Sequence, residues 1–246
     1  SHEIDQVVRE NARWVAEIAA EPRLDQQAQE LLPVQLGTLD LAGSRAYLEE
    51  KRPGIIAWKF DRQPALEPAL FAQSVGFLDS LHIATRRTET LTDGRLHELL
   101  ELPDHPWYDG DFTGLLQQLR SRLVAYFRDR NGTLSVSHGD YGYGNLLADA
   151  GSERITGVID WDQARLDLAG VDLLNFLIQR RRMTAQLSLP AAMSAVAQEL
   201  VTGAESTGSA LRGEMFGDSS EERRAVFAWS VWRFVERDTR YQSEYD

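Results

Sequence analysis

Residues 137–149, with the sequence SHGDYGYGNLLAD, constrain the fold of this chain more than any other segment. The segment combines three glycines and two tyrosines with a His-Gly-Asp triplet and an asparagine. Gly, Asp and Asn are poor formers of both helices and strands. We therefore expect a tight loop here that presents polar side chains.

The composition is that of a globular protein. The chain has 246 residues, which suits one large domain or two small ones, and 43% of them are hydrophobic, enough to bury a core. No uncharged run is apolar enough to span a membrane, and no secretory signal pattern opens the chain. Because cysteine is absent, the sequence excludes disulfides, thiolate nucleophiles and zinc–sulfur sites. We expect a cytoplasmic protein.

The charge balance bears on the partners. With 26 basic and 38 acidic side chains, the net charge is −12. This sign argues against binding to nucleic acid or to an anionic membrane. It favours a cationic small molecule as ligand, or it serves only to keep the protein in solution. The sequence leaves both interpretations open, and it gives no indication of the oligomeric state.

The spacing of apolar residues predicts a mostly helical chain with a few strands. Helical periodicity indicates helices over 4–20, 24–32, from 65 onward, 96–100, 112–127, 171–183, 191–201 and 221–237. Short apolar runs between turn residues indicate strands over 34–39, 45–49, 133–136, 145–147 and 154–159. The rest of 88–111 is predicted to be loop. Two early strands before a helical remainder indicate an α+β protein.

The polar residues of the glycine-rich segment have a spacing with chemical meaning. Asn145 lies five residues after Asp140, and fifteen residues later Asp160 follows an apolar strand directly. Phosphoryl transfer requires a carboxylate that orients the attacking hydroxyl, and oxygen ligands for magnesium that bridges the nucleotide phosphates. The spacing of Asp140 and Asn145 is that of the kinase catalytic loop. The pattern predicts a phosphoryl-transfer site, and a glycine-rich turn with surface aspartates is the alternative.

The segment HGDYGYGN, followed by GVIDWDQARLDLAGVDLL, resembles the aminoglycoside phosphotransferase family, with the related choline, homoserine and sugar kinases. The resemblance runs from about residue 8 to 182 and is most specific over 137–172. It implies a protein-kinase-like α+β fold, represented mostly by the helical C-terminal lobe with a reduced N-terminal lobe. Residues 1–52 would be the remnant of the nucleotide-binding lobe, and 53–246 the catalytic and acceptor-binding lobe.

The same resemblance implies roles for individual residues. Asp140 matches the catalytic base, whereas Asn145 and Asp160 match the residues that hold Mg²⁺ and, through it, the nucleotide. Asp172 matches a later structural aspartate of the family. The implied reaction transfers the γ-phosphate of ATP or GTP to a hydroxyl of an amino-sugar, a sugar or an amino-alcohol.

The N-terminal end departs from the family pattern. In the family, strands with a phosphate-binding loop and a lysine come before a helix with a partner glutamate. Here the first helix, with Glu10 or Glu17, resembles that helix, whereas Lys51 and Lys59 both follow it. We therefore expect a chain that lacks the first strands of the lobe, or a lobe completed by another chain. The alternative is a pseudokinase or ligand-binding module that keeps the pocket without turnover.

Other residues receive structural interpretations. We expect His138 and His82 to be structural, and the tryptophans Trp229 and Trp232 to belong to the core. Asp167 is expected at the surface. Tyr141 and Tyr143 either line the acceptor pocket or cover the loop. The acidic run near the C-terminus is a solvated tail or a binding site for an amino-sugar, and it comprises Glu236, Asp238, Glu244 and Asp246.

Overall fold

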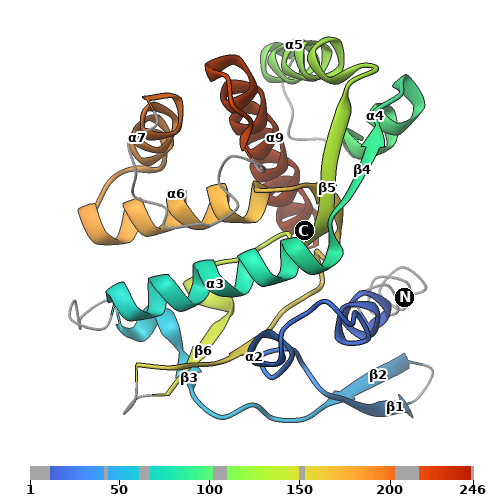
Figure 1. The fold of residues 1–246 in the computed structure, drawn as a ribbon, viewed down its shortest axis with the longest axis vertical. Helices are drawn as coiled ribbons and strands as arrows, with labels where there is room; N and C mark the ends of the chain where they lie inside the picture. Colours follow the sequence, from blue (N-terminus) through green and yellow to red (C-terminus); the bar gives the residue numbers. More distant parts are fainter. Residues whose placement is uncertain are drawn as a thin grey trace.

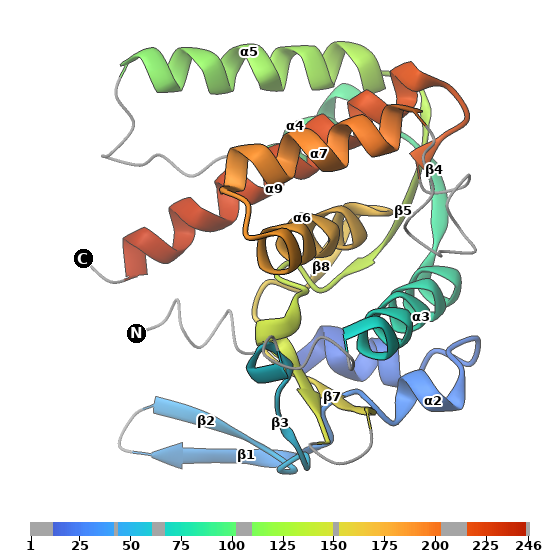
Figure 2. The same cartoon turned by 90° about the vertical axis from the view of Figure 1, so that its left-hand side faces the viewer.

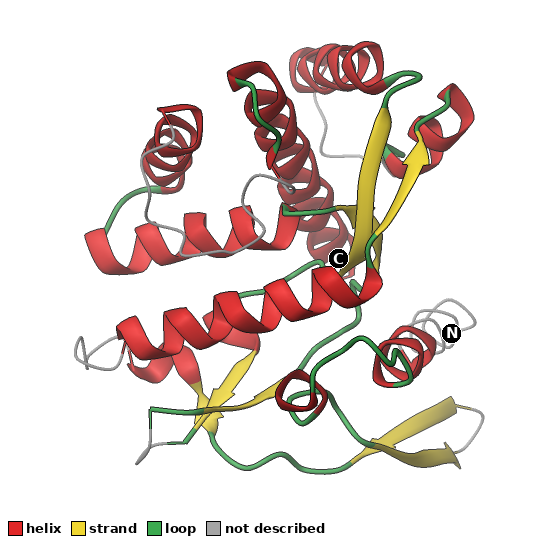
Figure 3. Cartoon of the chain, viewed as in Figure 1, coloured by secondary structure: helices red, strands yellow, loops and turns green. Residues whose placement is uncertain are grey.

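The computed structural model describes residues 12–41, 44–60, 67–101, 110–149, 153–202 and 216–244. Most of these residues are helical, and the strands form three small sheets (Figure 3). The predicted α+β class is confirmed. No helix in these ranges is long and apolar enough to cross a membrane.

The strands pair antiparallel within each sheet. The first sheet is a hairpin of β1 (Gln35–Leu41) and β2 (Ser44–Glu49). The second has the order β3 (Ile55–Ile56), β6 (Leu146–Ala148) and β7 (Ile155–Val158). The third has the order β4 (Arg87–Thr90), β5 (Asn131–Ser137) and β8 (Arg165–Leu168).

The helices fill the space around the second and third sheets. Residues 12–19 form the first described helix. The later helices are α2 (Gln26–Gln29), α3 (Glu67–Thr85), α4 (Asp93–Leu99), α5 (Gly110–Phe127), α6 (Val171–Ala185), α7 (Leu189–Thr202) and α9 (Ser220–Glu244). The 3-10 turns are η1 (Ala57–Phe60) and η2 (Tyr143–Asn145). The β1–β2 hairpin lies at one end of the molecule and α5 at the other (Figures 1 and 2).

The start of α6 lies inside the hydrophobic core. The first eight residues of α6 are all buried, including the polar Asp172 and Asn175. A helix buried on all sides lies inside a core rather than on its surface. By contrast, α5 is amphipathic: Leu116 and Phe127 are buried, whereas Leu115 is 62% exposed. The last helix packs Trp229 and Trp232 into the core, as the sequence predicted.

The segment predicted as a polar loop, 88–111, contains a strand and a longer helix than expected. The strand β4 has the sequence RTET and pairs with β5, where Arg87 lies opposite Leu134. Such a strand owes its conformation to the ladder hydrogen bonds of a neighbour, because its sequence has no apolar alternation. Helix α4 follows, and the hydroxyl of its N-cap Thr92 accepts a hydrogen bond from the Arg95 amide at 3.4 Å. Residues 102–109 lie outside the description.

Two further strands and one helix differ from the sequence prediction. The strands β3 and β8, with two and four residues, were not expected because runs this short carry no periodic signal. Helix α2 covers only four residues, and Asp25 caps it by accepting a hydrogen bond from the Ala28 amide at 2.7 Å. Residues 4–11 of the first predicted helix lie outside the description. The division of the chain near residue 52 stays a prediction.

A histidine in α3 makes the stability of this fold depend on pH. His82 is 2% exposed, and burial lowers the pKa of its imidazole, while the carboxylates of Asp172 and Asp79 act in the opposite direction. The folded protein therefore disfavours imidazolium, whereas the unfolded chain takes up the proton near pH 6.5. Because the unfolded state then binds more protons, this contribution to stability is present above pH 6.5 and is lost as the pH falls below it.

We predict that His82→Gln flattens this dependence. The midpoint of thermal unfolding should fall between about pH 7.5 and 5.5 in the parent, and by less in the variant, because glutamine does not titrate. His97→Gln is the matched control, since His97 is exposed. Parallel midpoint-against-pH curves for the parent and His82→Gln would contradict the prediction.

Candidate active site

The loop after β5 turns sharply before Asp140. Gly139 has a φ of 85°, in the left-handed region that favours glycine. A Cβ at this position would lie 2.4 Å from the carbonyl oxygen of Gln163 and 2.6 Å from its Cβ. Glycine is therefore required between His138 and Asp140, both by the backbone conformation and by the close approach of the 160s segment.

A buried carboxylate on α6 fixes the backbone of this loop. Asp172 is fully buried and accepts three hydrogen bonds from consecutive residues: the Ser137 hydroxyl at 2.8 Å, the His138 amide at 2.6 Å and the Gly139 amide at 3.1 Å. Hydrogen bonds to an ionised acceptor are about twice as strong as neutral ones. Asp172 thus holds the start of the loop against the first turn of α6.

The neighbouring histidine fixes the same loop from another side. The His138 ring is buried, and its Nε2 lies 2.9 Å from the carbonyl oxygen of Ile159. The ring also packs against Trp161, with ring centres 4.6 Å apart. These contacts engage Nε2 and pack the ring inside the protein, which supports the structural interpretation of His138 over a catalytic one.

Asp140 and Asn145 are in direct contact. The Asn145 side-chain nitrogen donates to the Asp140 carbonyl oxygen at 2.8 Å and to its carboxylate Oδ2 at 3.1 Å. Asp140 itself is half-buried. Because the amide nitrogen of Asn145 is engaged with Asp140, the amide oxygen is the atom suited to ligate a cation.

Asp160 lies beside this pair at the open end of the β6–β7 hairpin. In the hairpin Leu146 pairs with Val158, and the Ile159 amide donates to the Asn145 carbonyl at 2.9 Å. The next residue, Asp160, is exposed, and its backbone φ is 66°, a value that residues other than glycine rarely adopt. The structure therefore brings all three predicted site residues to one end of one hairpin.

The oxygen atoms of Asn145 and Asp160 suit a magnesium ion that is bound together with phosphates. Among the described residues, no group of three or more His, Cys, Asp or Glu is placed to hold a metal ion. Mg²⁺ commonly binds through one or two carboxylates, with waters and substrate phosphates completing its shell. One carboxylate from Asp160 and one amide oxygen from Asn145 fit that mode.

The second oxygen of the Asp140 carboxylate is held by a residue that the sequence reasoning missed. Nη1 of Arg237, on the last helix α9, lies 2.6 Å from Asp140 Oδ1. The Arg237 side chain is 8% exposed, so this ion pair is largely shielded from water.

The same face of α9 forms a buried ion network with β8. Asp167 accepts hydrogen bonds from Trp229 Nε1 at 2.9 Å and from Arg233 Nη2 at 3.0 Å. Glu236 joins Arg233 at 2.5 Å and Arg165 at 2.7 Å. Burial opposes the charged form of Arg233, but the two carboxylates outweigh it and raise its pKa.

Two sequence interpretations are therefore wrong. Asp167 was expected at the surface and Glu236 in a solvated tail or an amino-sugar site, yet each residue is 1% exposed and paired with arginine. The partners come from distant segments, so each acidic residue alone gave no sign of burial. The side chains of Asp238, Glu244 and Asp246 lie outside the description.

The two tyrosines of the loop point into the protein. The Tyr141 hydroxyl donates to the Ser74 carbonyl at 3.1 Å, and the Tyr143 hydroxyl donates to Glu67 Oε1 at 3.0 Å. Glu67 is also paired with Arg180 at 2.5 Å. Burial raises the pKa of both phenols. These contacts favour the interpretation that the tyrosines cover the loop.

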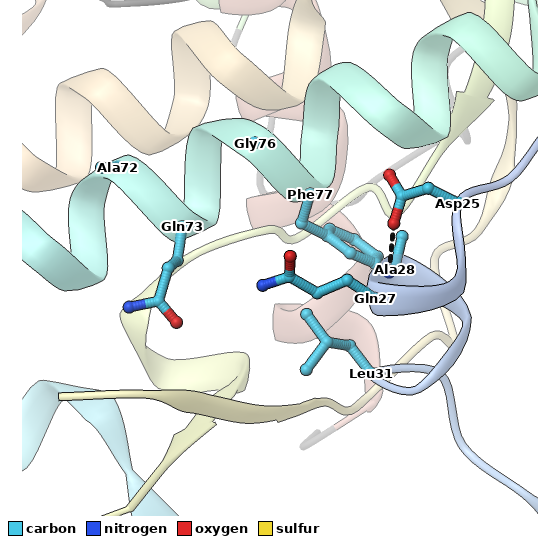
Figure 4. A pocket seen from close by; sticks show the side chains of 8 residues that line it. All are labelled: Asp25, Gln27, Ala28, Leu31, Ala72, Gln73, Gly76 and Phe77. Carbon is cyan, nitrogen blue, oxygen red and sulfur yellow. Dashed lines mark hydrogen bonds between the residues drawn. The ribbon is translucent and has the colours of Figure 1, made fainter. Parts of the chain in front are cut away.

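A pocket opens between α2 and α3 (Figure 4). Gln27 and Leu31 border it from α2 and its C-terminal side, and Gln73 and Phe77 from α3. Its lining includes none of the three predicted site residues. Phe77 links the two regions, because its ring stacks on Tyr141 with centres 5.9 Å apart.

The sequence pattern of the phosphotransferase enzyme family (APH) matches residues 7–208. This match covers most of the chain and includes the whole glycine-rich loop, both strands of the hairpin and α6. The chain belongs to this family. The phosphotransferase thus transfers phosphate to a hydroxyl group of a small molecule. A comparison with curated protein sequences finds no match.

Solved structures show the same fold. An aminoglycoside-3'-phosphotransferase of type VIII is 20% identical, with a TM-score of 0.51, and the alignment covers 94% of this chain and 82% of that one. A thermostable mutant of aminoglycoside phosphotransferase APH(4)-Ia, in a ternary complex with ADP and hygromycin B, is 18% identical with a TM-score of 0.57, covering 94% and 77%. The expected kinase-like fold of the phosphotransferase is confirmed.

The α9 residues of the site carried one weak sequence signal. Arg233, Glu236 and Arg237 lie three and four residues apart, so the spacing places them on one helical face. Periodicity cannot say which element that face meets. The contact with Asp140 therefore had no signal in the phosphotransferase sequence.

We predict that Asp172→Asn destabilises the phosphotransferase by about 1.5–3 kcal/mol, the usual contribution of a hydrogen bond to a charged group. The substitution keeps the shape of the side chain but removes the charge and replaces one acceptor oxygen with a donor. Glu98→Gln, at a carboxylate that is 69% exposed, is the control and should change stability little. Chemical denaturation measures both, and equal unfolding free energies for Asp172→Asn and the parent would contradict the assigned role.

Proposed function

We propose that this phosphotransferase transfers the γ-phosphate of ATP or GTP to a hydroxyl of an amino-sugar, a sugar or an amino-alcohol, with Asp140 as the proton acceptor. The observation that carries the proposal is the contact of Asp140 with Asn145 beside Asp160, on a loop whose backbone is fixed by Asp172. A carboxylate and hard oxygen ligands at one point are the parts that phosphoryl transfer requires.

The chain contributes chiefly position and charge to this reaction. A hydroxyl that donates a hydrogen bond to the Asp140 carboxylate has its oxygen aimed in a fixed direction. As that oxygen forms a bond to the γ-phosphorus, the bond from phosphorus to the β–γ bridging oxygen breaks. The nucleoside diphosphate leaves, and the hydroxyl proton passes to Asp140.

Asn145 and Asp160 are the residues that would hold magnesium with the nucleotide. When bound, Mg²⁺ neutralises charge on the phosphate oxygens. The left-handed backbone of Asp160 supports this role, because unusual backbone conformations on well-packed supports cluster at ligand sites. Asp160 follows β7, which pairs with β6 and whose last residue, Val158, donates its amide to the Leu31 carbonyl at 2.8 Å.

Two observations support an acceptor that carries amino groups. The chain has a net charge of −12, which attracts cationic molecules. The APH(4)-Ia structure that shares this fold contains the aminoglycoside hygromycin B. The acceptor experiment is a thermal-shift screen of aminoglycosides, macrolides, sugars and amino-alcohols with magnesium nucleotide. Hits should then give phosphorylated product by mass spectrometry. Binding without product across the panel would instead support the pseudokinase alternative.

We predict that Asp140→Asn lowers kcat by about 10²–10⁴-fold, the range that general base catalysis contributes. The affinities for acceptor and nucleotide should change little, because the lost interaction belongs to the transition state. Asp149→Asn, at an exposed carboxylate after β6, is the matched control. Steady-state phosphorylation measures both variants, and more than about half the parent kcat in Asp140→Asn would show that Asp140 is not the base.

A second prediction concerns the metal. Asp160→Asn should weaken magnesium-dependent nucleotide binding by removing the anionic ligand, while the fold stays intact because Asp160 is exposed. Calorimetric titration of nucleotide at a series of magnesium concentrations measures the effect, with circular dichroism as the folding control. Unchanged affinity at every magnesium concentration would remove Asp160 from the metal role.

A further inference from the structure

We propose that Arg237 is a positioning residue of this phosphotransferase, which holds the Asp140 carboxylate in the orientation that receives the acceptor hydroxyl. The proposal rests on the function proposed for Asp140. It adds a residue of α9 to the catalytic machinery, and this residue follows Asp140 by 97 positions in the sequence.

The Asp140 carboxylate is held from two directions. Arg237 Nη1 lies 2.6 Å from Oδ1, and Asn145 Nδ2 lies 3.1 Å from Oδ2. Because each carboxylate oxygen has a hydrogen-bond donor, the carboxylate cannot rotate about the Cβ–Cγ bond without breaking one of these contacts. Each carboxylate oxygen has two lone pairs, so neither contact by itself uses up the acceptor capacity of its oxygen. The two contacts orient the Asp140 carboxylate.

Arg237 is itself held firmly. Its side chain is 8% exposed, and its guanidinium lies 4.5 Å from the centre of the Phe234 ring. Arginine has no accessible neutral form in proteins, and a shielded charge without a partner is costly. The guanidinium therefore remains paired with Asp140.

The adjacent residue fixes the register of α9. Glu236 is paired with Arg165 of β8 and with Arg233, and Arg233 is paired with Asp167 of β8. A shift of α9 along or about its axis would break these buried pairs. The position of Arg237 is therefore set by β8.

β8 in turn is tied to the strand that leads into the catalytic loop. Arg165 lies opposite Ser137, the last residue of β5, and Asp167 lies opposite Ser135. The contacts thus form a closed path from β5 through the loop to Asp140, across to Arg237 and α9, and back through β8 to β5. Six charges lie on it, three arginines and three carboxylates, so the path is electrically neutral: Arg165, Arg233, Arg237, Asp140, Asp167 and Glu236.

A positioning role predicts a specific kinetic signature. In Arg237→Ala, kcat should fall by about 10–100-fold, since small misplacements of reacting groups have effects of up to that size. The KM values for acceptor and nucleotide should change less than about threefold, because the residue acts through Asp140. Arg237→Lys should recover part of kcat, as it restores the charge but not the planar guanidinium.

Two further measurements separate positioning from a general structural role. Added guanidinium ion should raise kcat of Arg237→Ala but not that of the parent. In an Asp140→Asn background, Arg237→Ala should cause no further loss, because the group it positions is already absent. The matched control is Arg128→Ala, which removes an equally short ion pair with Asp93 at the surface and should leave kcat unchanged.

The outcomes distinguish this role from the proposed function. The role of Arg237 would be overturned if Arg237→Ala left kcat unchanged, or if it lowered kcat in the Asp140→Asn background by the same factor as in the parent. Either result would leave the role proposed for Asp140 intact. A parent chain without turnover on any acceptor of the panel would overturn the proposed function and this role together. If Arg237→Ala does not fold, Arg237→Lys is used for the test instead. The proposal would then be overturned if Arg237→Lys had the same kcat as the parent and if added guanidinium ion did not change that kcat.

Discussion

The site depends first on one buried carboxylate. Asp172 lies in the first turn of α6, where the unsatisfied amides of the helix favour a negative charge. Its oxygens accept hydrogen bonds from three consecutive residues, 137–139, and so fix where β5 ends and the loop begins. Asp140 is the next residue, and its position follows from this anchor. Because α6 is buried on every side over its first two turns, the anchor itself cannot move independently of the core.

A second constraint acts on the side chain rather than on the backbone. The ion pair with Arg237 and the amide of Asn145 fix the Asp140 carboxylate, and α9 keeps its register through pairs with β8. Buried ion pairs contribute little net stability, because the desolvation of two charges offsets their attraction. The main effect of this network is therefore to position α9 against the loop that carries Asp140, rather than to add stability.

The candidate site could be predicted because its parts are close in sequence. Asp140, Asn145 and Asp160 span a loop and one hairpin, so local chain geometry alone brings them together. The fold class and most helices followed from apolar periodicity. The strands β4 and β8 did not, because each is only four residues long and polar in part, and each exists through pairing with β5. A strand defined by its neighbour leaves no periodic pattern in its own residues.

The sequence by itself determined which side chains can form the proposed site: a carboxylate and an amide at the spacing of a kinase loop, a second carboxylate after the next strand, and the glycine that the turn requires at 139. The tertiary structure alone decided which charges are buried and what orients Asp140. The spacing along α9 places Arg233, Glu236 and Arg237 on one face, but the partners of that face lie between 66 and 97 residues away. Burial of a charged residue depends on such partners, and local sequence carries no record of them.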